Sequence, residues 1–286
     1  MTSEDTPEQQ RGISRTPVRQ TIVDYGRGMG GGLVIGMPLL LTMEMWWSGF
    51  YMPPLKMLLF FGLNFLVLLI LEYYSGFREE RNLAEEVNDA VVALGFGIAI
   101  SAVILFVLSV LGAGMSLNEI SGKVIIESIP VSIGFSVAAS QLGQPQDGPQ
   151  RKKLSSGFWG TQAVALAGAV VFGFNIAPTE EPMMLGLRMD WWHSLAVVLI
   201  SLAQVYVIVY AVSFRGSRPL PEETAWWRVF LRVSTTSYVI ALLVGAYLLW
   251  TFGRVGPDTG VMASIQMIVT LGFVTSLGAA VGKLIL

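Results

Sequence analysis

The sequence is dominated by apolar segments that are each about as long as a lipid bilayer is thick. A transmembrane helix needs about 20 largely apolar residues to cross roughly 30 Å of hydrocarbon. Eight segments approach this length, and polar loops separate them. They lie at residues 29–48, 55–75, 89–112, 122–142, 157–178, 191–213, 233–252 and 261–284. We therefore expect an all-α fold, a polytopic transmembrane helix bundle with about eight spans.

The composition agrees with a membrane protein and excludes several other classes. Hydrophobic residues make up 53% of the chain, charged residues only 13%, and the mean hydropathy is +0.62. A soluble domain carries about a quarter charged residues, so this chain could not cover its surface in water. The net charge of −2 gives no support for nucleic-acid binding, and the absence of cysteine excludes disulfides and cysteine-ligated metals. Residues 1–20 are polar and lack the apolar core of a signal peptide, so we expect a disordered cytoplasmic tail.

The basic residues predict how the helices are oriented in the membrane. They concentrate in the N-terminal flank and in the loops after the second, fourth and sixth segments. They are Arg11, Arg15, Arg19, Arg27, Arg78, Arg81, Arg151, Lys152, Lys153, Arg215, Arg218 and Arg228. Because cytoplasmic loops carry the excess of lysine and arginine, we expect both termini in the cytoplasm. The pairs Trp46–Trp47 and Trp191–Trp192 then fall at the outer interface, where indole rings are enriched.

The two halves of the chain resemble each other. A shift of 137 residues aligns 31–78 with 168–215 without a gap, and 11 of the 48 pairs are identical. Two unrelated apolar segments would share about 4 identical pairs. These matches predict two parallel four-helix repeats, 21–148 and 149–286, related by an axis along the membrane normal.

A Thr-x-Glu motif recurs within the aligned region. It is Thr42 and Glu44 in "LLLTMEMWW", and Thr179 and Glu181 in "APTEEPMML". At 1.5 Å per residue, Glu44 is expected about 24 Å from the cytoplasmic start of its span, in the outer leaflet. Acids within a membrane are costly and usually face a cavity or a partner, and carboxylates and hydroxyls suit hard cations or protons. The motif therefore predicts an ion pathway with an acidic outer mouth.

Other polar residues extend this predicted pathway inward. Glu127 comes shortly after the start of the fourth segment, and a shift of 138 near the ends of the halves places Gln266 close to its counterpart. The same shift pairs a serine with a threonine deeper in the membrane. The residues expected along the pathway are Glu44, Glu181, Thr42, Thr179, Glu127, Gln266, Asn64, Ser201, Ser132 and Thr270, with Glu72 and Asp89 as an inner gate.

The same residues also allow structural roles. Thr179 can start a short surface helix, with Glu180 and Glu181 in its first turn near the positive end of the helix dipole. Glu44 can be a snorkelling or hydrogen-bonded carboxylate. His193, the only histidine, can be an interfacial residue.

No catalytic or cofactor motif accompanies the acids. The chain has no Ser-His-Asp set, no HExxH motif and no P-loop, and one histidine without cysteine excludes an ordinary zinc site. The string "GRGMGG" matches G-x-G-x-x-G, but a hydrophobic segment follows it, so close helix packing by small residues explains it better. We expect neither an enzyme nor a cofactor, and the residues leave any metal undefined.

Three segments, "MPLLLTMEMWWSGF", "EYYSGFREE" and "NIAPTEEPMML", resemble an uncharacterised family of bacterial integral membrane proteins, a domain of unknown function. The resemblance covers most of the chain, from residue 20 to the C-terminus. It implies a multi-pass protein of the bacterial inner membrane and carries over no catalytic residue.

Two classes of function fit these features. The leading hypothesis is an ion channel or ion-coupled transporter for cations or protons, with Glu44 and Glu181 as principal carboxylates. Its path would run within one chain or between subunits of a homo-oligomer. The alternative is a non-transporting scaffold or sensor whose outer acids bind a partner or a divalent ion. The expected partners are the lipid bilayer and a small inorganic ion or proton, and not nucleic acid.

Overall fold

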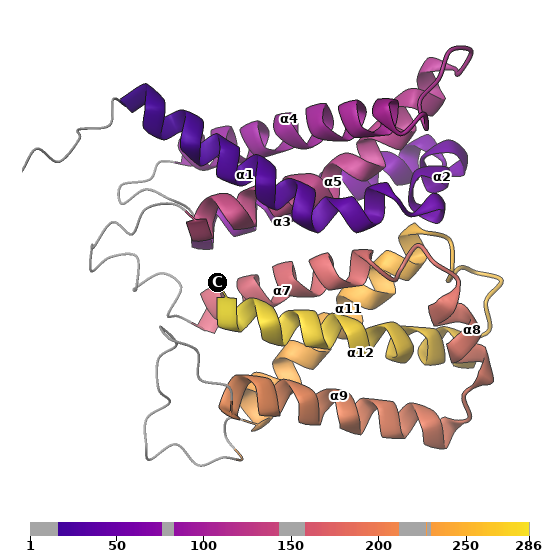
Figure 1. The fold of residues 1–286 in the computed structure, drawn as a ribbon. Coiled ribbons are helices and arrows are strands. Elements are labelled where there is room, and N and C mark those ends of the chain that lie inside the picture. The colour runs from indigo at the N-terminus through magenta and orange to yellow at the C-terminus, as the bar shows by residue number, and fades with distance from the viewer. Residues whose placement is uncertain (1–16, 76–82, 143–157, 212–226, 228–229, 286) are drawn as a thin grey trace, which may run out of the picture.

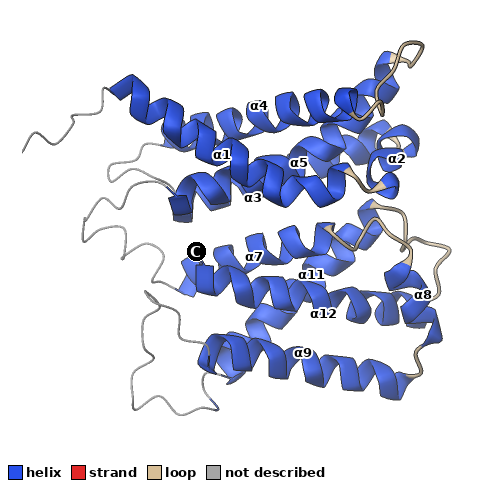
Figure 2. Ribbon diagram, in the orientation of Figure 1, coloured by secondary structure: helices blue, strands red, loops and turns tan. Residues whose placement is uncertain are grey.

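The structure is a computed structural model that describes residues 17–75, 83–142, 158–211, 227 and 230–285. Every regular element in these ranges is helical (Figure 2), which confirms the all-α fold. The predicted tail falls largely outside the described residues, as do the basic residues of the loops after α3 (Pro54–Ser75), α5 (Leu117–Leu142) and α9 (Trp191–Ala211). The remaining elements are α1 (Pro17–Leu40), α2 (Met43–Tyr51), α4 (Leu83–Val107), α7 (Phe158–Phe174), α8 (Glu181–Arg188), the π-helical turn η1 (Phe230–Ser234), α11 (Thr235–Thr251) and α12 (Val261–Ile285).

The helices occupy the same parts of the sequence as the eight predicted spans. Among the described residues, five helices are long and apolar enough to cross a membrane, namely α3, α4, α5, α9 and α12. The pair α1 and α2 passes the same test only together, and α7 and α11 are shorter apolar helices. The chain is thus a membrane bundle with several spans, and the count of eight stays a prediction.

The first half of the molecule, α1 to α5, lies beside the second half, α7 to α12 (Figure 1). In the first half, α5 packs against α1, α2, α3 and α4. In the second half, α12 takes the same place and packs against α7, α8, α9 and α11. The short helices α2 and α8 lie at the same end of the bundle, the right-hand end in Figure 1. The two halves therefore share one pattern of helix contacts.

Close glycine contacts fix how residues of the two halves correspond. Gly36 of α1 packs against the side chain of Val131 in α5, and Gly173 of α7 packs against Thr275 in α12. The two glycines are 137 residues apart, as the sequence predicts, but their partners are 144 apart. Each glycine lies where a Cβ would come within 3 Å of these side chains, so the small residue is what allows the two helices to approach.

The shift of 144 continues through the helices that precede α5 and α12. The turn after α4 has a left-handed residue at Ser109 (φ 60°), and the turn after α11 has one at Gly253 (φ 72°). The backbone hydrogen bonds of these turns also correspond, since Val110 and Arg254 donate to Leu105 and Leu249. Helices α5 and α12 begin 144 residues apart as well.

This register corrects the predicted shift of 138 near the ends of the halves. At 144, the counterpart of Glu127 is Leu271, not a position near Gln266. Ser132 corresponds to Ser276 rather than to Thr270. The error arose because "SIGF" and "TLGF" are short strings of common membrane residues, whereas the backbone contacts are specific.

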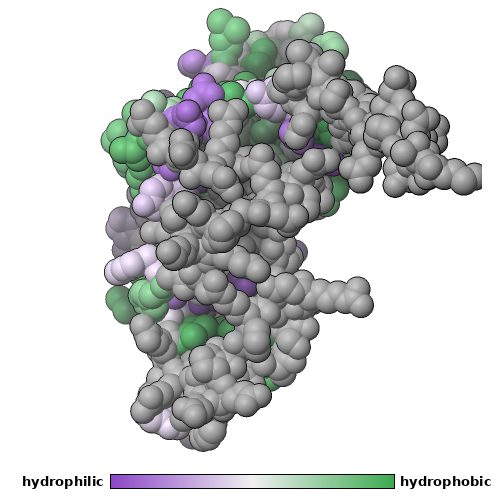
Figure 3. All heavy atoms as spheres, turned by 90° about the vertical axis from the view of Figure 1, so that its left-hand side faces the viewer, coloured by the Kyte–Doolittle hydropathy of each residue, from purple (hydrophilic) through white to green (hydrophobic). Residues whose placement is uncertain are grey.

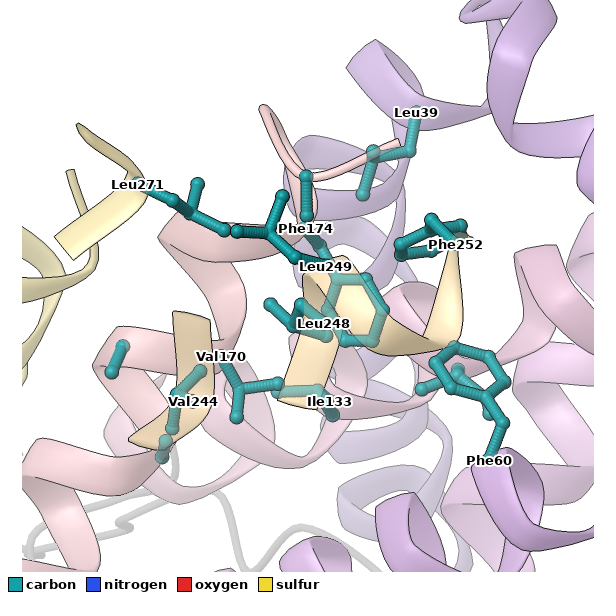
Figure 4. Packing of buried hydrophobic residues seen from close by; sticks show 14 of the residues in the cluster. Leu39, Phe60, Ile133, Val170, Phe174, Val244, Leu248, Leu249, Phe252 and Leu271 are labelled. Atoms are coloured by element: carbon teal, nitrogen blue, oxygen red, sulfur yellow. The ribbon is translucent and has the colours of Figure 1, made fainter. Parts of the chain in front are cut away.

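Apolar and aromatic side chains join the two halves. Phe60 of α3 packs edge-on against Phe174 of α7 and against Phe252, with ring centroids 5.7 and 5.9 Å apart (Figure 4). Beside them, the Asn64 side-chain amide donates to the Tyr247 hydroxyl at 2.9 Å. The two halves are thus held together through one continuous core.

The outward faces of the helices are hydrophobic, as lipid contact requires. Exposed side chains include Leu55 and Leu58 of α3, Phe106 and Val107 of α4, and Leu199 of α9. Hydrophobic side chains also reach the surface on the end of the molecule drawn in Figure 3. Together with the spans, these faces support a protein embedded in a bilayer.

Candidate functional site

The predicted first span is not one helix. It breaks after α1, and the axis turns by 79° between α1 and α2. The Thr42 hydroxyl donates to the Pro38 carbonyl at 2.6 Å and the Thr42 amide donates to Leu39 at 2.8 Å, which closes the end of α1. Glu44 therefore lies in the first turn of a short separate helix and is partly exposed. The expected depth of about 24 Å assumed a continuous helix, which the structure does not have, so this depth stays a prediction.

The corresponding corner between α7 and α8 holds Glu181 at the start of α8, where its side chain is exposed. The predicted short surface helix exists, but Glu180 and not Thr179 precedes its first residue. Arg254 covers this corner, because it donates to the Pro178 carbonyl and lies 3.9 Å from the Glu180 carboxylate. The Thr179 hydroxyl has one proton to give, either to Ile176, 2.7 Å away, or to Glu181. Together with Arg254, it lowers the pKa of the Glu181 carboxyl.

Glu127 is the most unusual side chain of the set. Helix α5 begins at Leu117, earlier than the predicted start at 122, so Glu127 is ten residues into the helix. That is about 15 Å along the helix axis from its first residue. The residue is 0% exposed, and among the described residues neither carboxylate oxygen has a hydrogen-bond partner.

The neighbours of Glu127 on α5 show which way it faces. Lys123, Glu127 and Val131 are four residues apart and share one face of the helix. Val131 packs on Gly36 near the end of α1, and the backbone of Lys123 packs on Gly49 in α2. Glu127 lies between these two contacts and faces the broken corner between α1 and α2. First-turn amides of a helix such as α2 have no partner within the helix, so this corner offers polar groups in an otherwise apolar setting.

A row of serines follows Glu127 along α5. Ser128, Ser132 and Ser136 are four residues apart, lie on one helix face and are at most 1% exposed. Ser132 packs against Gly97 of α4. Ser136 donates at 2.6 Å to the Glu72 carboxylate of α3, which is itself 4% exposed.

Further buried polar groups flank this row on α4. Ser101, one turn from Gly97, is 0% exposed, and its hydroxyl has no partner among the described residues. Glu86 lies in the first turn of α4 and is also buried. Helices α3, α4 and α5 thus enclose a file of serine hydroxyls that ends at Glu72. Glu127 comes just before this file in α5, on a neighbouring face of the helix.

The second half lacks this file. At the shift of 144, Glu127 corresponds to Leu271, and Ser128 and Ser136 correspond to Gly272 and Ala280. The same shift matches Ser101 with Gly245, and the shift of 137 matches Glu72 with Val209. Only Ser132 keeps a hydroxyl counterpart, Ser276. The two halves share their packing but not their buried acids.

The other predicted pathway residues are dispersed. Asn64 bridges to the second half through Tyr247, and Ser201 donates to the carbonyl four residues earlier in its own helix. Gln266 donates to the Met189 carbonyl, and Thr270 donates to the Gln266 carbonyl. None of these four contacts brings its residue to Glu127. At the predicted inner gate, Glu72 is buried and Asp89 is partly exposed, and both have interaction partners.

Sequence reasoning predicted Ser132 but missed Ser128, Ser136 and the pair Glu119–Lys123. The signal was present, because "SIPVSIGFS" carries serine at every fourth position on a segment already expected to be a helix. In the described part of the chain, no group of three or more histidine, aspartate or glutamate side chains could hold a metal ion.

The fold and the site define a polytopic helical membrane protein with an acid buried within one of its long helices. The chain belongs to the DUF2391 family of integral membrane proteins, whose family model matches residues 24–286. No curated protein and no solved structure matches the chain. The family assignment confirms the expected resemblance, and the chemistry must be argued from the residues.

Proposed function

We propose that the protein transports protons or small cations across the membrane through its first half, with Glu127 as the central carboxylate. The observation that carries this proposal is the buried, unpartnered side chain of Glu127. An isolated carboxylate in an apolar interior is far too costly to keep ionised without compensation. A membrane protein that retains such an acid usually uses it in an ion pathway or a proton relay.

The serine row supports a route from Glu127 toward the cytoplasmic side. A hydroxyl can donate one hydrogen bond and accept two, so it can hand on a proton or contribute an oxygen to a passing ion. The row ends at Glu72, which Ser136 already contacts at 2.6 Å. In this proposal Glu72 marks one end of the file, and Glu127, on a neighbouring face of α5, supplies the proton or ion that enters it.

The recurrence of helix contacts supports an ancestral duplication, which is part of the proposal. Both copies kept a helix break followed by a glutamate, Glu44 in one and Glu181 in the other. These residues lie at corners on the same end of the bundle (Figure 1) and are partly or fully exposed. We assign them to the outer mouth, where they attract cations, rather than to the central step.

The test is ion flux with the full-length protein in proteoliposomes, measured for protons and for a panel of cations. Glu127→Gln keeps the size and polarity of the side chain and removes its charge, and it should reduce flux by at least 10-fold. Leu271→Gln is the matched control, because it introduces the same side chain at the corresponding place in the second half. Normal flux in a folded Glu127→Gln variant contradicts the proposal.

A second function has its own supporting observation. The exposed acids at the start of α8, Glu180 and Glu181, could bind a partner or a divalent ion on the outer surface of a non-transporting scaffold or sensor. In that case wild-type vesicles show ligand binding without flux. Charge reversal at Glu180 and Glu181 would then abolish binding, while Glu127→Gln would leave it unchanged.

A further inference from the structure

Lys123 is a buried cation next to the proposed pathway. It is 5% exposed, although it lies inside a membrane-spanning helix. Its ammonium group forms a salt bridge of 2.7 Å with Glu119. It also lies 3.5 Å from the Val110 carbonyl and 5.7 Å from the centre of the Trp46 ring. These contacts hold it between α2 and the loop that follows α4.

Lys123 has a second acid within reach. Residues four apart on a helix are neighbours, with Cβ atoms about 5–6 Å apart. Glu119 is four residues before Lys123 and Glu127 is four residues after it, on the same face of α5. In this structure the lysine pairs with Glu119, and Glu127 has no partner among the described residues. The lysine is therefore shared by two carboxylates, of which it can pair closely with one.

We infer that Lys123 is the outer gate of the Glu127 pathway and exchanges between the two acids. When Glu127 holds a proton it is neutral, and Lys123 stays with Glu119, as in this structure. When Glu127 releases its proton inward, the ammonium swings to the new buried carboxylate and separates it from the outer mouth. The only bond that breaks is the O–H of Glu127. This inference rests on the proposed function and names how the same site is regulated.

The surroundings favour Glu127 over Glu119 as the partner of Lys123 once Glu127 is ionised. A buried carboxylate without a counter-charge is strongly disfavoured, because removing one partner of a buried pair leaves an uncompensated charge. Glu119 has 21% of its side chain exposed, so water can compensate it when the lysine leaves. Glu127 has no such exposure.

Few other charged groups act on this region. From α2, Glu44 and Tyr51 lie near the same corner, and Lys56 at the start of α3 packs over the Trp250 ring instead. Three neighbouring segments carry no titratable residue. They are residues 32–40 of α1, residues 97–107 of α4 and the loop at 108–116. Lys123 is consequently the cation best placed to control Glu127. In the second half, Met267 corresponds to Lys123 and Leu271 corresponds to Glu127, so these positions hold no equivalent pair of lysine and acid.

The test measures proton flux as a function of pH in proteoliposomes that contain the full chain. Lys123→Met copies the second half and removes the counter-charge of ionised Glu127, so Glu127 stays protonated to higher pH. The pH of half-maximal flux should rise by about one unit or more, the usual effect of a nearby charge. Glu119→Gln frees Lys123 for Glu127, and the same midpoint should fall. Lys123→Arg, which keeps the charge, should stay close to wild type.

Opposite shifts in the two variants support the gate, since a merely structural defect would not move the midpoint in both directions. If flux depends on Glu127 but the two midpoints stay unchanged or move together, the gate is overturned and the proposed function stands. If flux does not depend on Glu127 at all, both are overturned. Glu119→Gln alters a partly exposed side chain, so it remains informative even if Lys123→Met does not fold.

Discussion

The two halves of this protein share one pattern of helix packing but bury different side chains. Both place a central helix, α5 or α12, against four others, and both hold it through glycine contacts at matched positions. Yet the first half buries Glu127, Glu72 and a row of three serines, where the second half has leucine, valine, glycine and alanine and keeps one serine, Ser276. The second half thus shows that the fold does not need the acids. Their presence in the first half points to a function that packing does not explain.

The corners at the end of the bundle that holds α2 and α8 show the same difference between the halves. In the second half, Arg254 reaches the Pro178 carbonyl and lies beside Glu180, so the break between α7 and α8 is closed by a cation. In the first half, the residue that corresponds to Arg254 is Val110, and the corner faces the carboxylate of Glu127. One corner is thus stabilised by charge, and the other faces an uncompensated acid.

The largest expected effect comes from making the first half resemble the second. Glu127→Leu introduces the residue found at the matched position, Leu271, and removes an unpartnered polar group from the interior. We expect the variant to be more stable by about 1–3 kcal/mol and to lose transport. Thermal unfolding in detergent and flux in vesicles measure the two effects on one preparation. A less stable Glu127→Leu protein would mean that the acid is structural.

A second prediction sharpens the claim that the packing is shared. A Cβ on Gly36 would lie 2.4 Å from Val131, and one on Gly173 would lie 2.6 Å from Leu248. Because overpacking displaces the facing helix, Gly36→Leu and Gly173→Leu should each destabilise the protein by about 1–3 kcal/mol. Gly62→Ala is the control, since nothing lies within 4 Å of the added carbon. If one of these two variants is as stable as the wild type and the other is not, the two halves do not share the same packing.

These glycines also show what the sequence could and could not reveal. The lengths of the apolar segments predicted the membrane bundle. The shift of 137 matched Gly36 with Gly173, and both glycines pack closely against the central helix of their half. The register of α5 against α12 could not be read, because an insertion of seven residues lies between the aligned regions and the apolar strings on both sides are alike. The position of Glu127 within its helix was missed because α5 starts with the polar stretch from Leu117, which hydropathy alone assigns to a loop.

The Thr-x-Glu motif was the most prominent signal and led to a wrong geometry. It marks a helix break in both halves, where Thr42 and Thr179 close the preceding turn through their hydroxyls. A local motif of this kind predicts only the bend that it forms in the chain. Burial of an acid such as Glu127 depends on four other helices and is visible only in three dimensions.

A third, smaller effect concerns the corner of the second half. Arg254→Val copies Val110 and removes the hydrogen bond to Pro178, while Arg254 is 16% exposed. Loss of a charged hydrogen bond at a mostly buried site should cost about 1–2 kcal/mol. Hydrogen exchange should rise in α8 and leave α2 unchanged. Faster exchange in both short helices would show that the two corners are coupled.

The smallest effect is expected at Glu181, in α8 and outside the membrane-spanning helices. The Thr179 hydroxyl and Arg254 lower the pKa of its carboxyl, so its ionised form adds stability above the unfolded pKa of about 4.3. That contribution is lost as the pH falls through the lowered value. Because the side chain is exposed, Glu181→Gln should change stability by less than about 0.5 kcal/mol. Unfolding curves at neutral and acidic pH measure it, and a larger loss would indicate a buried partner for this acid.

The most direct test of the account is infrared difference spectroscopy of the protein in lipid during a pH titration. We predict a carboxylic-acid band that titrates, shifts in D2O because its proton exchanges with water, and disappears in Glu127→Gln. A spectrum in which Glu127→Gln changes no carboxylic-acid band, or a band that never exchanges in D2O, would contradict the claim that Glu127 moves a proton through the first half.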